Sequence, residues 1–277
     1  QSSLGANAPK TPSAIARWLK RMRSCLIVVI PLLILGLGRF TVVKAFGYQE
    51  HVSEYGMHWN FFMTLAGISL LVTALDIPLL YSGLVGIVVL AFYQYLLEGM
   101  GVAKWIIEAP RTDFFSQNRE GILSCIGYLA LYLFGQKIGS YILSASRTKR
   151  QWWRVVQYAT AGGFLCWIAA AGMYYLVDMQ ASRRMVNMPY VLYTLACNLF
   201  IISAFITADL LSISTPNPLF DAVATKRNSQ LVIFTIANLL TGATNVFYGT
   251  FNRPFSAAFV AMSVYMALVS IVALYWH

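Results

Sequence analysis

The chain has 277 residues, of which 58% are hydrophobic and only 11% charged, and its mean hydropathy is +0.64. A soluble domain of this size needs far more polar surface, so the composition excludes an ordinary water-soluble protein and leaves the lipid bilayer as the solvent. The net charge of +10 invites a nucleic-acid interpretation. Basic residues confined to loops between apolar segments are typical of membrane proteins, however, and we expect no nucleic-acid partner.

The chain opens with a polar leader, and apolar residues between Ile15 and Met22 then recur at helical spacing with basic residues among them. This pattern predicts a short amphipathic helix in the headgroup layer. Such a helix could dock a phosphate-bearing ligand, but a positively charged flank that orients the first span is the simpler explanation. We assign residues 1–24 to this basic leader and residues 25–277 to a transmembrane helical bundle.

Apolar segments that are long enough to cross a hydrocarbon core, at about 20 residues each, follow along the rest of the chain. The expected spans are residues 25–46, 59–75, 78–97, 122–143, 152–177, 189–210, 231–247 and 255–275. These segments are apolar on all sides instead of alternating between apolar and polar residues, which favours helices over barrel strands. The sequence therefore predicts an all-α fold, a polytopic transmembrane helix bundle of about eight spans.

Lys and Arg residues are more frequent in the loops that share a side with the amino end than in those on the other side. Because cytoplasmic loops carry the excess of Lys and Arg, and because the number of spans is even, we expect both ends of the chain in the cytoplasm.

The densest polar cluster, residues 48–60, lies at a membrane boundary on the opposite side. Glu54 and His58 are four residues apart, so a helix would place them on one face. A histidine beside a carboxylate is a plausible general base, because the carboxylate holds the imidazole tautomer and stabilises its cation. A capped, hydrogen-bonded helix entry explains the same residues equally well.

A second cluster lies in the long loop at residues 98–121, on the same side as the first by the count of spans. Arg111 and Arg119 offer bidentate donors for a phosphate, and Asp113 and Glu120 offer carboxylates for sugar hydroxyls. Salt bridges among these residues are the alternative. On the other side, residues 147–154 combine basic residues with tryptophans, which would suit the phosphates of an acyl-CoA but also an ordinary basic loop.

Asn238, Thr241 and Asn245 give one expected span a polar stripe, which must face protein or a cavity because lipid does not tolerate it. Buried hydrogen bonds between helices explain such asparagines in most cases. With few histidines and no closely spaced Cys or His residues, we expect no metal site.

Four segments together resemble the inositol acyltransferase family of glycosylphosphatidylinositol (GPI) anchor biosynthesis, and its yeast members in particular. They are GYQEHVSEYGMHWNFFMTL (47–65), EGILSCIGYLALYLFGQKIG (120–139), RMVNMPYVLYTLACNLF (184–200) and LLTGATNVFYGTF (239–251). The resemblance implies a multi-pass enzyme of the endoplasmic reticulum that moves a fatty acyl chain, typically palmitoyl, from acyl-CoA to the inositol hydroxyl of glucosaminyl-phosphatidylinositol.

The same resemblance implies no cofactor other than acyl-CoA as co-substrate, and it implies a larger protein. Members of the family are expected to have more spans than this chain, so its helices look like a carboxyl-terminal portion whose partner is the amino-terminal helices of the same protein. The family's catalytic residues are expected upstream, and no position here matches their motif.

We therefore predict a substrate-binding set, and no catalytic residue, in this chain. The predicted set is Glu54, His58, Asn60, Arg111, Asp113, Asn238 and Asn245. The alternative function is that of a multi-pass transporter or lipid scramblase, in which the polar residues within the spans would line a path for the cargo.

Overall fold

The structure of the protein is a computed structural model that describes residues 13–45, 55–143, 146–211, 219, 221, 223, 229–248 and 254–275. Within these ranges the chain is helical and contains no strand, which confirms the predicted all-α class. The chain forms two compact units, Gln1–Thr207 and Ala208–His277.

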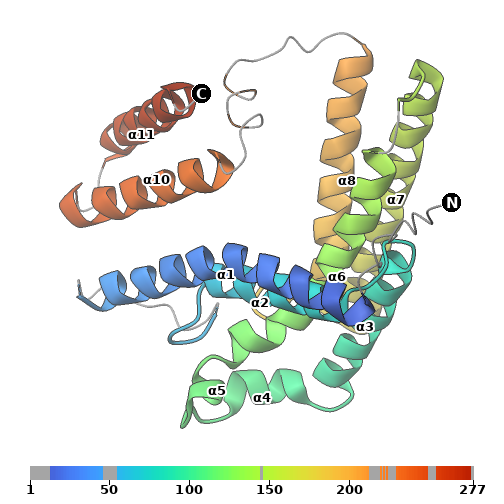
Figure 1. Ribbon diagram of the computed structural model, residues 1–277, viewed down its shortest axis with the longest axis horizontal. Helices are drawn as coiled ribbons and strands as arrows, with labels where there is room; N and C mark the ends of the chain where they lie inside the picture. The colour runs from blue at the N-terminus through green and yellow to red at the C-terminus, as the bar shows by residue number, and fades with distance from the viewer. Residues whose placement is uncertain are drawn as a thin grey trace, which may run out of the picture. The chain divides into compact units, whose positions relative to one another are not determined.

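The first unit is a series of helices (Figure 1). In chain order they are α1 (Ala14–Ala45), α2 (Phe61–Leu75), α3 (Ser82–Glu98), α4 (Val102–Glu108), α5 (Phe114–Gln117), α6 (Arg119–Ile142), α7 (Lys149–Val177) and α8 (Met188–Leu210). The last turn of α8 already belongs to the second unit.

Five of the described helices are long and apolar enough to cross a membrane, namely α1 over Ala14–Thr41, α6, α7, α8 and α11 (Phe255–Tyr275). Helices α3 and α4 together form a sixth candidate, which is bent by 58° at the break between them. The remaining two expected spans occur as the shorter apolar helices Phe61–Leu75 and Gln230–Ala243. Each segment that we expected to span the membrane is thus helical in its described part, and the polytopic helical fold is confirmed.

Helix α1 is continuous over 32 residues, so the amphipathic residues 15–22 are its first turns and not an element separate from the first span. At about 1.5 Å per residue, α1 is about 48 Å long, which exceeds the roughly 30 Å of a hydrocarbon core. The helix is therefore longer than a perpendicular crossing of the core needs. The division of the chain into a leader and a bundle stays a prediction.

Helices α1 and α2 pack as an antiparallel pair whose outer end is fixed by polar contacts. The indole nitrogen of Trp18 donates to the carbonyl oxygen of Ala74 at 3.1 Å, and Arg21 forms an ion pair with Asp76 at 2.6 Å. Asp76 ends α2 in the left-handed conformation, which turns the chain toward α3. The beginning of α1 and the end of α2 consequently lie at the same end of the unit.

Helices α3 and α6 also pack together, and the connection from α7 to α8 closes over them. Their shared core contains Leu90 of α3 and Ala130 of α6, together with Val186 from the connection and Val191 and Leu195 from α8. Val186 and Ala130 are completely buried. The end of the connection, at Val186 and Asn187, is therefore part of the core, whereas Asp178, Gln180 and Arg183 are exposed.

In the second unit, α10 (Ser229–Ala243) continues directly into a single π-helical turn, η1 (Thr244–Tyr248), and α11 packs against α10. π-Helical turns are rare and occur mostly at functional sites. The turn falls within the segment TGATNVFYGT that the sequence analysis compared with the acyltransferase family.

Candidate functional site

Asn60 begins α2 and ties it to α1. Its side-chain oxygen accepts the backbone N–H groups of Phe62 at 3.1 Å and Met63 at 3.3 Å, so Asn60 is the N-cap of the helix. Its Nδ2 donates to the carbonyl oxygen of Gly36 on α1 at 2.8 Å. This is the capped helix entry that the sequence allowed as an alternative, and it leaves the buried amide little capacity for a substrate.

The two residues before Asn60 are held by Asn118, which is completely buried. The side-chain oxygen of Asn118 accepts the backbone N–H groups of His58 at 2.8 Å and Trp59 at 2.9 Å. Its Nδ2 donates to the carbonyl oxygen of Phe114 at 2.8 Å. The two polar clusters of the sequence therefore meet at one end of the first unit, as the count of spans requires.

A glycine allows this close meeting of the two segments. Gly56 has a φ of +102°, and a Cβ atom there would lie 2.5 Å from the carbonyl oxygen of Gln117. The adjacent backbone N–H of Met57 donates to the same carbonyl oxygen at 2.9 Å. Any larger residue at position 56 would force the two segments apart and break this hydrogen bond.

His58 is half-buried and is the histidine that the structure describes in the first polar cluster. Its ring meets the ring of Phe40 edge to face, with 5.0 Å between the centroids. Its Nδ1 is buried and has no hydrogen-bond partner among the described residues. Buried polar atoms are nearly always paired, so an unpaired one is a candidate for binding a ligand. This nitrogen could accept a hydroxyl proton or donate to a substrate.

Asp113 begins α5 with a capping box. Its side-chain oxygen accepts the backbone N–H groups of Phe115 at 2.9 Å and Ser116 at 3.0 Å, and the Ser116 hydroxyl accepts the N–H of Asp113 at 3.0 Å. The hydrogen bonds from Ser116, and then that from Phe115, hold the pKa of the Asp113 carboxyl below its ordinary value of 3.8. The carboxylate that the sequence offered to sugar hydroxyls thus has a local role at a helix start.

Glu120 lies at the centre of the cluster, with its side chain 0% exposed. Arg111 binds both carboxylate oxygens, through Nη1 at 3.1 Å and Nη2 at 2.5 Å. Arg184, from the connection between α7 and α8, donates from Nη2 to one of them at 2.6 Å. Arg111 and Glu120 therefore form a salt bridge with each other. The sequence analysis gave such a salt bridge as the alternative to binding phosphate and sugar hydroxyls.

Arg119, the neighbour of Glu120, is buried and binds backbone instead of a carboxylate. Its Nε donates to the carbonyl oxygen of Ile106 at 2.8 Å, and its Nη2 donates to that of Ala109 at 2.7 Å. Its Nη1 donates to the carbonyl oxygen of Pro110 at 3.2 Å, and the guanidinium lies 5.1 Å from the ring centroid of Trp105. Arg119 thereby fixes the end of α4 against the start of α6.

The connection that carries Arg184 is held in a strained conformation. Val186 has a φ of +51°, which is unfavourable for a β-branched residue, and it is completely buried. The Tyr93 hydroxyl donates to the carbonyl oxygen of Met185 at 2.7 Å. The carbonyl of Val186 approaches Gly127 so closely that α6 has no room for a Cβ atom there. These contacts place Arg184 over Glu120.

We call Arg111, Asn118, Arg119, Glu120 and Arg184 the polar junction. It connects α4, α5 and α6, the entry to α2 and the connection from α7 to α8. The sequence analysis did not single out Asn118 and Arg184. The only sequence signal for either residue is its position in a polar run at the boundary of an apolar span, which gives no information on its partners.

The predicted substrate-binding residues divide into three groups. His58, Asn60, Arg111 and Asp113 lie in or beside the polar junction. Glu54 lies outside the described residues. Asn238 and Asn245 belong to the second unit, where Asn238 donates to the carbonyl oxygen of Phe234 in its own helix at 2.8 Å. Asn238, one of the three residues of the predicted polar stripe, is therefore hydrogen-bonded within its own helix.

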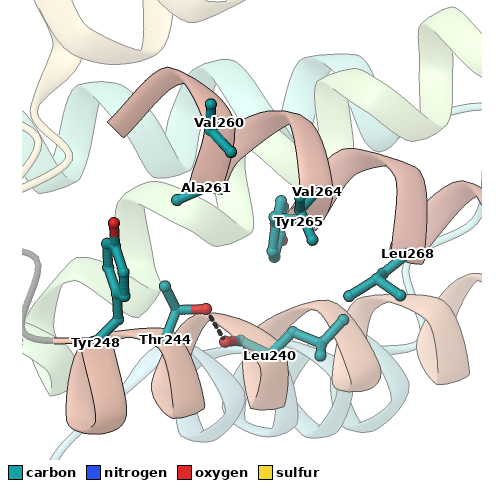
Figure 2. Close-up of a pocket in the computed structure, with 8 residues that line it drawn as sticks. All are labelled: Leu240, Thr244, Tyr248, Val260, Ala261, Val264, Tyr265 and Leu268. Atoms are coloured by element: carbon teal, nitrogen blue, oxygen red, sulfur yellow. Dashed lines mark hydrogen bonds between the residues drawn. The ribbon is translucent and has the colours of Figure 1, made fainter. Parts of the chain in front are cut away.

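The second unit contains a cavity of about 300 Å³ between α10, η1 and α11. Figure 2 shows side chains of both helices pointing toward each other around it, and the Thr244 hydroxyl bonds to the carbonyl oxygen of Leu240 at 2.8 Å. The lining is almost entirely apolar, apart from Thr244 and the hydroxyls of two tyrosines. The lining residues are Leu240, Thr244, Tyr248, Val260, Ala261, Val264, Tyr265 and Leu268.

The basic cluster at residues 147–154 is partly used by the fold itself. Arg147 donates to the carbonyl oxygens of Tyr141 and Ile142 at the end of α6. Its guanidinium also lies 4.9 Å from the ring centroid of Tyr141 and 5.1 Å from that of Trp152. For Arg147, the structural role that the sequence favoured over phosphate binding is therefore the one observed.

Comparison with known proteins gives a consistent set of relatives. The family model described as GWT1 matches residues 3–276. The chain is 36% identical over 244 residues to the phosphatidylinositol-glycan biosynthesis class W protein of Dictyostelium discoideum, an alignment that covers 88% of this chain and 49% of that protein.

Fungal relatives carry the name GPI-anchored wall transfer protein 1. The chain is 36% identical over 282 residues to that of Yarrowia lipolytica, covering 92% of this chain and 58% of the relative. It is 34% identical over 256 residues to that of Schizosaccharomyces pombe, covering 87% and 54%. The chain spans about half the length of the curated relatives that it matches. Since the family model extends over nearly the whole chain, the chain belongs to the GWT1 family.

Proposed function

We propose that the protein to which this chain belongs transfers a fatty acyl chain, palmitoyl, from acyl-CoA to the inositol hydroxyl of glucosaminyl-phosphatidylinositol during GPI-anchor biosynthesis. We place it in the endoplasmic reticulum membrane, with the carboxyl terminus of this chain on the cytoplasmic side. The observation that carries the proposal is the 36% identity, along 88% of the chain, to a relative named for phosphatidylinositol-glycan biosynthesis.

Acyl transfer to an alcohol needs a base near the hydroxyl and hydrogen-bond donors for the carbonyl oxygen as negative charge develops on it. His58 fits the first role best among the described residues, because its Nδ1 is buried and unpaired. The CoA thiolate leaves readily and needs less help from an acid. In this proposal, the His58 imidazole takes the proton of the inositol hydroxyl, and Asn60 holds the start of α2 beside it. Glu54, Asn238 and Asn245 stay predicted substrate-binding residues.

The first test substitutes His58 and Asn245 with alanine, each in the full-length protein, and measures acyl transfer in microsomes at equal protein level. Loss of a general base lowers turnover by about 10²–10⁴-fold, and we expect His58→Ala to fall in that range. The side-chain change leaves the backbone N–H of His58 on Asn118, so the fold keeps that contact. For Asn245→Ala we expect a smaller loss, of about tenfold, equivalent to one hydrogen bond.

Asn198→Ala is the matched control, because Asn198 lies on α8 and donates to the carbonyl oxygen of Thr194 in its own helix. We expect it to retain wild-type turnover. Wild-type turnover in both His58→Ala and Asn245→Ala would exclude these residues from the reaction. A purified full-length protein that binds the glycolipid but never forms an acylated inositol would favour the transporter or scramblase function.

A further inference from the structure

The polar junction holds more positive than negative charge. Arg111, Arg119 and Arg184 act electrostatically on one another and on Glu120, the carboxylate at their centre. Glu120 is 0% exposed, whereas the side chains of Arg111 and Arg184 are 22% and 28% exposed. A single carboxylate therefore neutralises one of three guanidiniums, and the excess charge is only partly in contact with solvent.

The unused hydrogen-bonding capacity lies on Arg184. Arg119 has all three guanidinium nitrogens on backbone carbonyls, and Arg111 uses both terminal nitrogens on Glu120. Arg184 donates one hydrogen bond to Glu120 from Nη2, while its Nε is buried and has no hydrogen-bond partner among the described residues. A buried guanidinium N–H without an acceptor is costly, because a charged donor has lost its water.

An anion with several oxygens would satisfy both conditions. Guanidinium forks bind phosphate oxygens in pairs, with charge-assisted bonds about twice as strong as neutral ones. The polar junction lies at the start of α6, a membrane-spanning helix, so the anions in reach are those of the bilayer surface. A phosphate has more acceptor oxygens than a carboxylate, so it is the better match for a site in which three guanidiniums share one carboxylate.

We propose that Arg184 binds the phosphate group of a phospholipid, and that Glu120, itself held by Arg111, keeps the Arg184 guanidinium in position for it. The identification of this lipid with the glycolipid acceptor, whose phosphodiester links inositol to the lipid tails, rests on the proposed function. In this arrangement, the strained connection around Val186 fixes the backbone on either side of Arg184.

The test measures binding of short-chain dihexanoyl phosphatidylinositol to the purified full-length protein by calorimetry. We expect Arg184→Gln to weaken binding by about tenfold or more, the effect of losing charge-assisted bonds. Lys104→Gln is the matched control, because Lys104 is an exposed residue on α4 with only a loose ion pair to Glu108. It should bind like the wild type. Equal affinity in wild type and Arg184→Gln would overturn the proposal.

Two further ligands identify the source of the phosphate. Dihexanoyl glycerol, which lacks the phosphate, should bind wild type and Arg184→Gln alike. Inorganic phosphate alone should bind weakly, because the apolar tails add to the affinity. If inorganic phosphate shows the full Arg184-dependent affinity and the lipid adds nothing, the assignment to a phospholipid is wrong.

Glu120→Gln gives a test of opposite sign and remains informative if Arg184→Gln fails to fold. The glutamine oxygen can still accept from Arg184 and keep it in position, but the guanidiniums lose their counter-charge. We therefore expect a lower melting temperature without ligand and a larger upward shift on adding the lipid than in wild type. A smaller shift than in wild type would contradict the proposal.

Failure of this inference is distinguishable from failure of the proposed function. If Arg184→Gln transfers acyl groups with an unchanged KM for the glycolipid and also binds dihexanoyl phosphatidylinositol like the wild type, the phosphate site is wrong and the proposed enzyme function stands. Arg184-dependent lipid binding by a protein without acyl transfer would keep the phosphate site and remove the enzyme.

Discussion

At the scale of single residues, Asn118 shows how a polar side chain can be indispensable without touching a substrate. Its oxygen accepts two backbone N–H groups and its nitrogen donates to one carbonyl, all in a completely buried position. The sequence could not reveal this role, because His58 and Trp59 lie 60 and 59 residues away along the chain. Asparagine is an unremarkable residue in the polar run where it occurs.

Asn118→Ala should destabilise the protein by about 3 kcal/mol, because it leaves the N–H groups of His58 and Trp59 buried without an acceptor. The measurement is the melting temperature of the purified full-length protein. Gln117→Ala is the control, since the neighbouring Gln117 contributes its backbone carbonyl and not its side chain to this region. The role assigned to Asn118 is wrong if the two variants melt together.

The residue types at the site were easier to predict than their partners. The sequence singled out His58, Asn60, Arg111 and Asp113 as polar residues on one side of the expected bundle, and the structure brings them to one end of the first unit. It could not distinguish a capping asparagine from a substrate ligand, because both require the same amide. The partners are set by tertiary contacts between residues far apart in the chain.

At the scale of helices, the long apolar segments were predictable because spanning a bilayer demands about 20 apolar residues in a row, and no tertiary contact is needed to see them. The structure of the long loop at residues 98–121 was harder to predict, because this loop contains two short helices, α4 and α5. Their signals are local and weak: a glycine with a φ of +69° before α4, and the Asp113 and Ser116 pair at α5. Neither helix is long enough for hydrophobic periodicity to show.

The start of α5 should loosen in acid. Because the pKa of Asp113 in the folded protein lies below its ordinary value of 3.8, its contribution to stability is fully present above that value. It is lost as the pH falls through the lowered pKa, when the protonated carboxyl no longer accepts strongly from Ser116 and Phe115. Hydrogen exchange of the peptide 114–117, corrected for the intrinsic rate, should therefore rise in this range.

Asp113→Asn provides the control for this acid effect, since an amide caps a helix but does not titrate in this range. Its exchange should show no step as the pH falls. An equal step in Asp113→Asn and wild type would mean that another group controls the loosening.

At the scale of the whole molecule, the contacts of the first unit divide its polar residues between two ends. The ion pair of Arg21 with Asp76 lies at one end, as does Lys137, whose Nζ donates to the carbonyl oxygen of Leu80 at 3.4 Å. The polar junction lies at the other end, because α2 begins there and ends beside Arg21. Which of these ends faces the cytoplasm stays a prediction from the uneven distribution of Lys and Arg.

The same topology predicts which positions are accessible from the cytoplasm. In sealed microsomes, Arg150→Cys at the start of α7 should react with a membrane-impermeant maleimide, because basic loops collect on the cytoplasmic side. Lys104→Cys on α4 should react only after permeabilisation. Both positions are exposed, and the unsubstituted protein gives the background from its own cysteines. The reverse pattern of labelling would invert the proposed orientation.

The pairing of Glu120 with Arg184 also bears on how the chain is made. The two residues are 64 positions apart, whereas Arg111 precedes Glu120 by only nine. At about 5–20 residues per second, the ribosome adds Arg184 about 3–13 s after Glu120. Arg111 is therefore available to the carboxylate as soon as Glu120 is made, whereas the second guanidinium can bind it only after the whole of α7 has been synthesised.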